Sequence, residues 1–163
     1  MSALWRPAYI ALGSNLDDPR EQVLAACVRI GGLPATRIEA RSRLYATRPL
    51  GPQDQPDYIN AAVGVVTQLE PQVLLAALLQ IERQMGRVRR EQWGPRRIDL
   101  DLVWMVGAVI SEPGLSLPHP GVSSRNFVLY PLNDIAPTLD IPGHGRVHVL
   151  KARSAAEGIS GVE

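Results

Sequence analysis

The stretch of sequence that decides the fold reads Ile98-Asp99-Leu100-Asp101-Leu102-Val103-Trp104. Its apolar residues predict a strand inside a sheet, and two aspartates interrupt the apolar run. Successive side chains of a strand point to opposite faces, so Asp99 and Asp101 share one face, with their backbones roughly 7 Å apart. A divalent cation would offset their mutual repulsion, and Mg²⁺ commonly binds one or two carboxylates together with phosphate oxygens. The alternative is a pair of solvated surface charges, which the apolar neighbours disfavour.

Strands and helices follow one another in a recognisable order before this segment. Apolar runs and alternation predict three earlier strands, over residues 8–12, 38–45 and 58–67. Two helices are expected between them: one begins with Asp18 as its N-cap and ends at residues 31–32, and the other has apolar residues at helical spacing over residues 74–85. The order strand, helix, strand, strand, helix, strand is typical of the ferredoxin-like βαββαβ fold. This is an α+β sandwich with an antiparallel sheet, helices on one face and long substrate-binding loops on the other.

The remaining segments are rich in proline and glycine. A short helix is predicted over residues 124–132 and a small edge strand over residues 147–150. Two long loops are expected over residues 45–57 and 86–97. Loops of this length within a compact domain are more often functional than idle.

Length and composition predict one ordinary domain over residues 1–163. The net charge is +1, which gives no support to a nucleic-acid-binding function. No apolar run approaches the roughly 18 residues that suggest a membrane span, and no signal peptide is recognisable. We therefore expect a cytoplasmic monomer without a membrane or nucleic-acid partner, in which the single cysteine, Cys27, is a core residue.

A basic segment leads directly into the two aspartates. The chain contains sixteen arginines and one lysine, and five of the arginines fall between residues 87 and 97, where Glu91 is the only acidic residue. The planar guanidinium group suits phosphates, and phosphoryl transfer depends on metal ions and arginines to stabilise charge. A solvated basic loop is the simpler alternative.

Three further groups are candidates for ligand contact. Tyr58 and Asn60 alternate along a predicted strand, and an aromatic ring beside an amide suits a flat heterocycle. His119 lies between two prolines and could donate to a phosphate or cap a turn. Phe127 is the only phenylalanine, and residues 13–15 form a glycine turn after the first strand. Core packing and ordinary turns explain each of these features equally well when it is taken alone.

Four motifs become specific when they are taken together. They are ALGSNL at residues 11–16, LGPQDQPDYINAA at 50–62, WGPRRIDLD at 93–101 and LPHP at 117–120. In order and spacing they resemble the 6-hydroxymethyl-7,8-dihydropterin pyrophosphokinase family of folate biosynthesis. The resemblance covers about residues 8–142 and implies a ferredoxin-like fold with a short C-terminal tail.

The resemblance also implies a reaction and a set of site residues. The hydroxymethyl oxygen of 6-hydroxymethyl-7,8-dihydropterin would attack the β-phosphorus of ATP, with AMP leaving and two Mg²⁺ ions bound by Asp99 and Asp101. The residues implied to act in catalysis are Arg87, Arg96, Asp99 and Asp101. Those implied to bind the pterin are Thr47, Leu50, Tyr58, Asn60, Trp93 and Phe127. Those implied to bind the nucleotide are Glu82, Arg87, Arg89, Leu102, Ser116, His119 and Arg125.

Some positions depart from the family pattern, and other functions stay open. Gln92 and Gly114 stand where arginines are common, and Arg90 stands for a lysine. A nucleotidyltransferase is disfavoured because its Gly-Ser pair lies close to its aspartates, whereas Ser14 is far from Asp99 in this chain. The remaining alternative is a ferredoxin-like module that binds RNA or a small molecule without catalysis.

Overall fold

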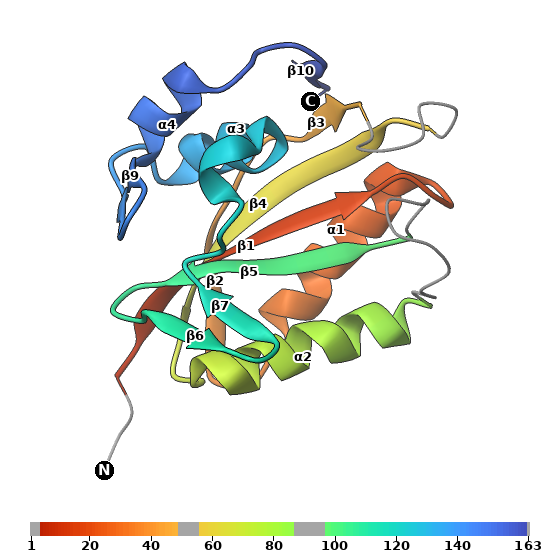
Figure 1. The fold of residues 1–163 in the computed structure, drawn as a ribbon. Coiled ribbons are helices and arrows are strands. Elements are labelled where there is room, and N and C mark those ends of the chain that lie inside the picture. The colour runs from red at the N-terminus through yellow and green to blue at the C-terminus, as the bar shows by residue number, and fades with distance from the viewer. Residues whose placement is uncertain (1–3, 49–55, 87–96, 163) are drawn as a thin grey trace.

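A six-stranded antiparallel sheet forms the centre of the protein (Figure 1). The computed structural model describes residues 4–48, 56–86 and 97–162. The sheet contains β1 (Arg6–Ser14), β2 (Thr36–Arg41), β3 (Tyr45–Thr47), β4 (Tyr58–Thr67), β5 (Asp99–Met105) and β10 (Ile159–Gly161). Their order is β10-β3-β4-β1-β5, and β2 also pairs with β4. The strand of the two aspartates, β5, therefore lies at one edge of this sheet, which corrects the prediction of a strand inside it. Its apolar residues are buried by packing on the sheet and not by strands on both sides.

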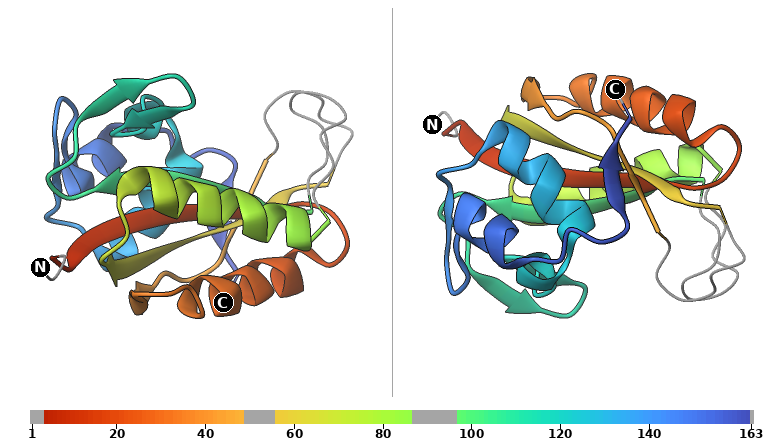
Figure 2. Two further views of the ribbon diagram at one scale, coloured as in Figure 1. Left: turned by 90° about the horizontal axis from the view of Figure 1, so that it is seen from below. Right: turned by 90° about the horizontal axis from the view of Figure 1, so that it is seen from above.

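Helices cover both faces of the sheet. Helices α1 (Pro19–Gly31) and α2 (Pro71–Gln84) lie side by side on one face, as the view from below shows (Figure 2). Helices α3 (Asn126–Ile135) and α4 (Val147–Arg153) lie over the other face. The ferredoxin-like α+β fold is confirmed, and α3 and α4 add partial cover to the face that the sequence had assigned to loops.

The core lies between the sheet and the first two helices. Residues Ile10 and Leu12 of β1 are buried with Leu74 and Leu78 of α2, whose spacing places them on one helical face. The alternate side chains of β1 and β4 point to the opposite face of the sheet, toward α3. Tyr9 of β1 pairs with Gly64 of β4, and both lie near Ile135 of α3. Alternation along β1 thus separates the core from the opposite face of the sheet.

Smaller elements follow β5. The hairpin of β6 (Ile110–Glu112) and β7 (Leu115–Leu117) packs beside β5 and precedes the short 3-10 helix η1 (Val122–Ser124). A second hairpin, β8 (Asp140–Ile141) with β9 (Gly145–Arg146), leads into α4. Gly114 lies in the turn between β6 and β7 at φ 82, a conformation that glycine adopts without the strain of a side chain.

Three sequence predictions were wrong in detail. The segment 147–150 is the start of α4 and not an edge strand, because Val147 and Leu150 are spaced to bury one helical face. The predicted strand 38–45 is divided into β2 and β3, since Ser42 interrupts the regular backbone pairing. Its N–H donates to the Ala62 carbonyl, and its Oγ accepts the Ala62 N–H. Asp18 occupies the N-cap position in a left-handed conformation (φ 63), and its side chain caps no N–H group in the described part of the chain.

Candidate active site

Strand register places four of the predicted site residues on one face of the sheet. Asp99 lies opposite Gly13, which in turn lies opposite Asn60. Asp101 lies opposite Ala11, which is two residues before Gly13 in β1. Residues that face each other across a ladder point to the same side, and Tyr58 shares its parity with Asn60. The two carboxylates, the amide and the phenol ring therefore share the face opposite α1 and α2.

Small residues separate these polar side chains along the sheet. Ala11 and Gly13 of β1 are paired with Ala62 and Asn60 of β4. A large side chain at these central positions would fill the space above the sheet between β5 and β3. The small residues thus form a flat floor with carboxylates on one side and the Tyr58 ring on the other.

Gly13 is required for the position of Asn60. A methyl group at Gly13 would lie 2.7 Å from Oδ1 of Asn60, which is closer than a carbon and an oxygen can approach. The Asn60 amide is buried and donates through Nδ2 to Oγ1 of Thr47. Neighbouring Asn15, also buried, donates through Nδ2 to the Pro56 carbonyl at 2.9 Å. Gly13 therefore makes room for the amide that we expect to bind a heterocycle, and it does so as a paired residue of β1, not as part of the turn after that strand that the sequence predicted.

The two aromatic candidates come from different elements. Tyr58 is half-buried at the start of β4 and pairs with Thr47 of β3. Phe127 lies in the first turn of α3 and lines an open pocket of roughly 470 Å³ together with Thr47. Thr47 thus adjoins both residues, which agrees with a heterocycle site between β3, β4 and α3.

His119 lies beside the carboxylate side of this face. Its backbone N–H donates to the Val103 carbonyl at 2.8 Å, and its Nδ1 accepts the Gly121 N–H at 3.0 Å. The neutral ring therefore carries its proton on Nε2, which remains available as a donor. Burial lowers the pKa of His119, an effect that Arg125 and His144 reinforce and the Asp101 carboxylate opposes. His119 is thus held as a neutral donor near neutral pH.

Arg125 connects the two parts of the site. It lines a narrow pocket with Asp101 and His119, and it also lines the larger pocket with Phe127. Its guanidinium carbon lies 5.8 Å from the centre of the Phe127 ring. A methyl group at Gly121 would lie 2.7 Å from Arg125 Nε, so that glycine makes room for the arginine.

The three other described nucleotide-site candidates have different surroundings. Glu82 of α2 is 4% exposed, and its Oε2 accepts the Leu100 N–H at 2.7 Å, which ties α2 to β5 between the two aspartates. Leu102 is 4% exposed and pairs with Ile10, so its side chain belongs to the core and only its backbone can meet a ligand. Ser116 is exposed on β7.

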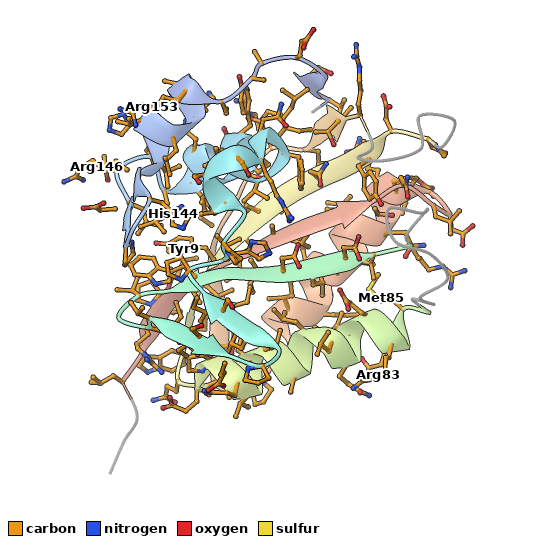
Figure 3. The ribbon with its side chains drawn as sticks, in the orientation of Figure 1. Tyr9, Arg83, Met85, His144, Arg146 and Arg153 are labelled. Carbon is orange, nitrogen blue, oxygen red and sulfur yellow. The ribbon has the colours of Figure 1, made fainter. Side chains whose placement is uncertain are left out.

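Arg97 is a residue whose contacts the sequence did not suggest. Its Nε and Nη2 donate to Oδ2 of Asp17 at 2.9 and 2.6 Å, and its Nη1 donates to the Met85 carbonyl at 3.3 Å. Met85 follows the end of α2, as Figure 3 shows. A single side chain thus links the start of β5 to α2 and to the turn before α1.

Several predicted site residues lie outside the described residues. They are Leu50, Arg87, Arg89, Trp93 and Arg96, together with the departures at Arg90 and Gln92. Their roles stay predictions. The expected loop 45–57 is wrong at its start, where residues 45–47 form strand β3 and pair with β4; residues 49–55 and 87–96 of the two expected loops lie outside the described residues.

The described donors suit a metal that is completed by substrate oxygens. Among residues 4–48, 56–86 and 97–162, no group of three or more histidine, cysteine or acidic side chains is placed to hold a metal ion. Two carboxylates on one face match the way Mg²⁺ is bound by one or two carboxylates, substrate phosphates and water. The donor set therefore fits Mg²⁺ bound together with a phosphate compound.

The fold and the site together define a class of protein, a ferredoxin-like α+β protein with acidic and aromatic side chains on one face of its sheet. The model of the 7,8-dihydro-6-hydroxymethylpterin-pyrophosphokinase family matches residues 9–137. The chain belongs to this family and is a pyrophosphokinase of folate biosynthesis.

Individual relatives agree over nearly the whole chain. A 2-amino-4-hydroxy-6-hydroxymethyldihydropteridine pyrophosphokinase of Pseudomonas aeruginosa is 46% identical over 93% of each chain. The Methylorubrum extorquens protein of the same name is 44% identical over 96% of this chain and 98% of its own. The similarity to these relatives therefore extends well beyond the four motifs quoted from the sequence.

The fold is also similar to that of a solved structure. The wild-type HPPK-DHPS of Plasmodium falciparum, determined with pterin and p-hydroxybenzoate, superposes with a TM-score of 0.73 at 16% identity. The match covers 93% of this chain and 43% of that one. At this identity the likeness concerns the fold alone.

None of the helices that the structure describes is long and apolar enough to cross a bilayer.

Proposed function

We propose that the face of the sheet carrying Asp99, Asp101, Tyr58 and Asn60 transfers a diphosphate from ATP to 6-hydroxymethyl-7,8-dihydropterin. The hydroxymethyl oxygen forms a bond to the β-phosphorus, the bond from that phosphorus to the oxygen bridging to the α-phosphorus breaks, and AMP leaves. The hydroxyl proton passes to solvent. The single observation that carries the proposal is the register, which brings two carboxylates onto the same face as Asn60 and Tyr58.

The heterocycle site lies on the β3 and β4 side of the face. The Tyr58 and Phe127 rings stack on the two sides of the pterin, and Asn60 hydrogen-bonds its edge. Thr47 and Leu50 add backbone groups to that edge, and Trp93 covers the bound ring. Gly13 supports this arrangement because it leaves space for the Asn60 amide.

The triphosphate site lies on the β5 side. Two Mg²⁺ ions bound by Asp99 and Asp101 would neutralise the charge that develops on the phosphate oxygens. His119 donates from Nε2, and Arg125 contributes a fixed positive charge between the two substrates. Glu82 holds β5 at the position of the carboxylates, while Leu102 and Ser116 border the nucleotide. Arg87, Arg89 and Arg96 are proposed to contact the phosphates, with Arg87 and Arg96 acting in the transition state.

The chain is proposed to work as one domain and as a cytoplasmic monomer on these two small substrates, without nucleic acid. Its net charge of +1 supports the absence of a nucleic-acid partner. Light scattering coupled to size exclusion measures the oligomeric state, and a mass above one chain would contradict the monomer.

The reaction is tested by phosphorus NMR of the chain mixed with Mg²⁺, ATP and 6-hydroxymethyl-7,8-dihydropterin. We expect AMP and a pterin diphosphate, and only when all components are present. ADP would indicate attack on the terminal phosphorus, and free pyrophosphate would indicate nucleotidyl transfer. No product from a folded chain would favour a ferredoxin-like module that binds its ligand without catalysis.

A further inference from the structure

The C-terminal segment, residues 155–161, lies against the proposed pterin site although it falls outside the part of the chain that the family model matches. Its strand β10 extends the main sheet by pairing with β3, with Ile159 opposite Thr47. The Arg48 N–H donates to the Gly158 carbonyl at 3.0 Å, next to this pair. Figure 1 shows β10 beside β3 at the edge of the sheet. The segment thus holds the strand that carries Thr47.

The same segment is tied to the start of α3. Nδ2 of Asn126 donates to the Ala155 carbonyl at 2.8 Å and to the Glu157 carbonyl at 3.2 Å. Asn126 is the first residue of α3 and precedes Phe127 directly. One side chain therefore links the segment to the helical turn that carries the Phe127 ring.

The segment also forms one wall of the pocket between these elements. Thr47 and Phe127 line the pocket of roughly 470 Å³ together with Ala155, Glu157 and Gly158 of the segment. Strand β3 and helix α3 reach the pocket from different parts of the chain. The segment and its two attachments connect them beside the space where a ligand would lie.

We propose that residues 155–161 position the pterin site by holding β3 and the first turn of α3 at a fixed separation, with Asn126 as the positioning residue. This inference rests on the proposed function. It assigns to the segment an effect on pterin binding that Asp99, Asp101 and His119 do not share, because they lie on other elements. Asn126 also lines the pocket, but its Nδ2 is bonded to the segment, so the role proposed for it is positioning.

Gly158 gives a second way to disturb the segment. Its φ of 75 lies in the left-handed region, and a methyl group there would lie 3.2 to 3.3 Å from carbons of the Arg48 side chain. Gly107 offers a matched control, since it has a φ of 87 and a methyl group there would meet nothing within 4 Å. Alanine at either glycine brings the same backbone strain, but only the substitution at Gly158 disturbs the contact with β3.

The test compares Asn126→Ala, Asn126→Asp and Gly158→Ala with wild type and Gly107→Ala. The measurements are KM for the pterin, KM for ATP, kcat, and pterin affinity by calorimetry with oxidised 6-hydroxymethylpterin in the absence of ATP. We expect the pterin KM and Kd of the three segment variants to rise about 3- to 10-fold, since the Asn126 variants lose the two bonds to the segment and Gly158→Ala crowds Arg48 beside β3. The ATP KM and kcat at saturating pterin should change less than about twofold, and Gly107→Ala should match wild type in all four.

Two results would overturn the inference. Unchanged pterin affinity in Asn126→Ala and Asn126→Asp would show that the segment does not position the site. An equal loss of ATP and pterin binding, together with a lowered Tm, would mean a merely structural role. Failure of the proposed function is a separate result, because wild type would then make no AMP. A wild-type chain that makes AMP while all segment variants bind pterin normally refutes only the inference.

Discussion

Replacing Gly13 with alanine tests the heterocycle site at its most restricted point. The new methyl group would lie 2.7 Å from Oδ1 of Asn60, so the amide must turn away from β1. That amide is 5% exposed and bonded to Thr47, so turning it breaks a buried hydrogen bond. A lost buried bond costs about 1–3 kcal/mol, and the lower chain entropy of alanine offsets about 0.5–1 kcal/mol of this. We expect a net destabilisation of about 1–2 kcal/mol.

The effect on ligand binding should exceed the effect on stability. Asn60 is proposed to hydrogen-bond the pterin edge, and a turned amide loses those bonds while leaving ligand polar groups unpaired. The loss of about 1.5–3 kcal/mol corresponds to roughly 10- to 100-fold weaker pterin binding. Calorimetry with 6-hydroxymethylpterin measures this, and ATP binding measured in parallel should change little.

Gly64→Ala is the matched control, because Gly64 lies on the same face and a methyl group there meets Tyr9 at an ordinary 3.5 Å. We expect its pterin affinity to equal that of wild type. The reasoning would be refuted by a Gly13→Ala variant that keeps full pterin affinity, since the Asn60 amide would then have no part in recognition. Equal weakening in both variants would point to general strain in the sheet.

Three further predictions concern the rest of the site. Asp99→Asn and Asp101→Asn should each lower kcat by at least about 100-fold with the far-UV circular dichroism spectrum unchanged, because Mg²⁺ binding loses a charged ligand; substantial turnover in either variant would contradict the metal assignment. Tyr58→Ala and Phe127→Ala should weaken pterin binding about 10-fold while sparing ATP, as expected for stacked rings; parallel loss of both ligands would indicate a folding defect. His119 has a folded pKa below its ordinary value of 6.5, so its contribution to stability is present above that pH and is lost as pH falls through the folded pKa. His119→Asn, which keeps an acceptor for the Gly121 N–H, should therefore lose less stability than wild type between about pH 7 and about pH 5 in urea titrations; identical slopes would refute this.

Local patterns were sufficient to predict the order of the βαββαβ elements and the shared face of the aspartates. Alternation alone placed Asp99 with Asp101 and Tyr58 with Asn60, because a strand has a period of two. It could not place one pair against the other, since that depends on the register of β1 with both β4 and β5. The proximity of Gly13 to Asn60 follows only from that long-range pairing.

Other contacts had no local signal. Residues 155–161 contain a single large apolar residue, Ile159, so no periodicity marks β10, and its pairing is provided by β3. Glu82 has the sequence environment of any helical glutamate, and its bond to the Leu100 N–H depends on how α2 packs against β5. For residues 147–150, Val147 with Val149 fits a strand and Val147 with Leu150 fits a helix, and packing against α3 decides for the helix.

Because the site residues lie on separate elements, substitutions should fall into two groups that affect different steps of binding or catalysis. The proposed pterin contacts come from β3, β4 and α3, whereas the carboxylates come from β5 and His119 from the segment after β7. Substitutions on the first group should therefore change pterin binding, and those on the second group should change ATP binding or kcat. Arg125 lines both pockets, so it is the described residue at which the two effects should appear together. Double-mutant cycles between Arg125 and either Phe127 or His119 should accordingly show coupling, while a cycle between Phe127 and His119 should be close to additive.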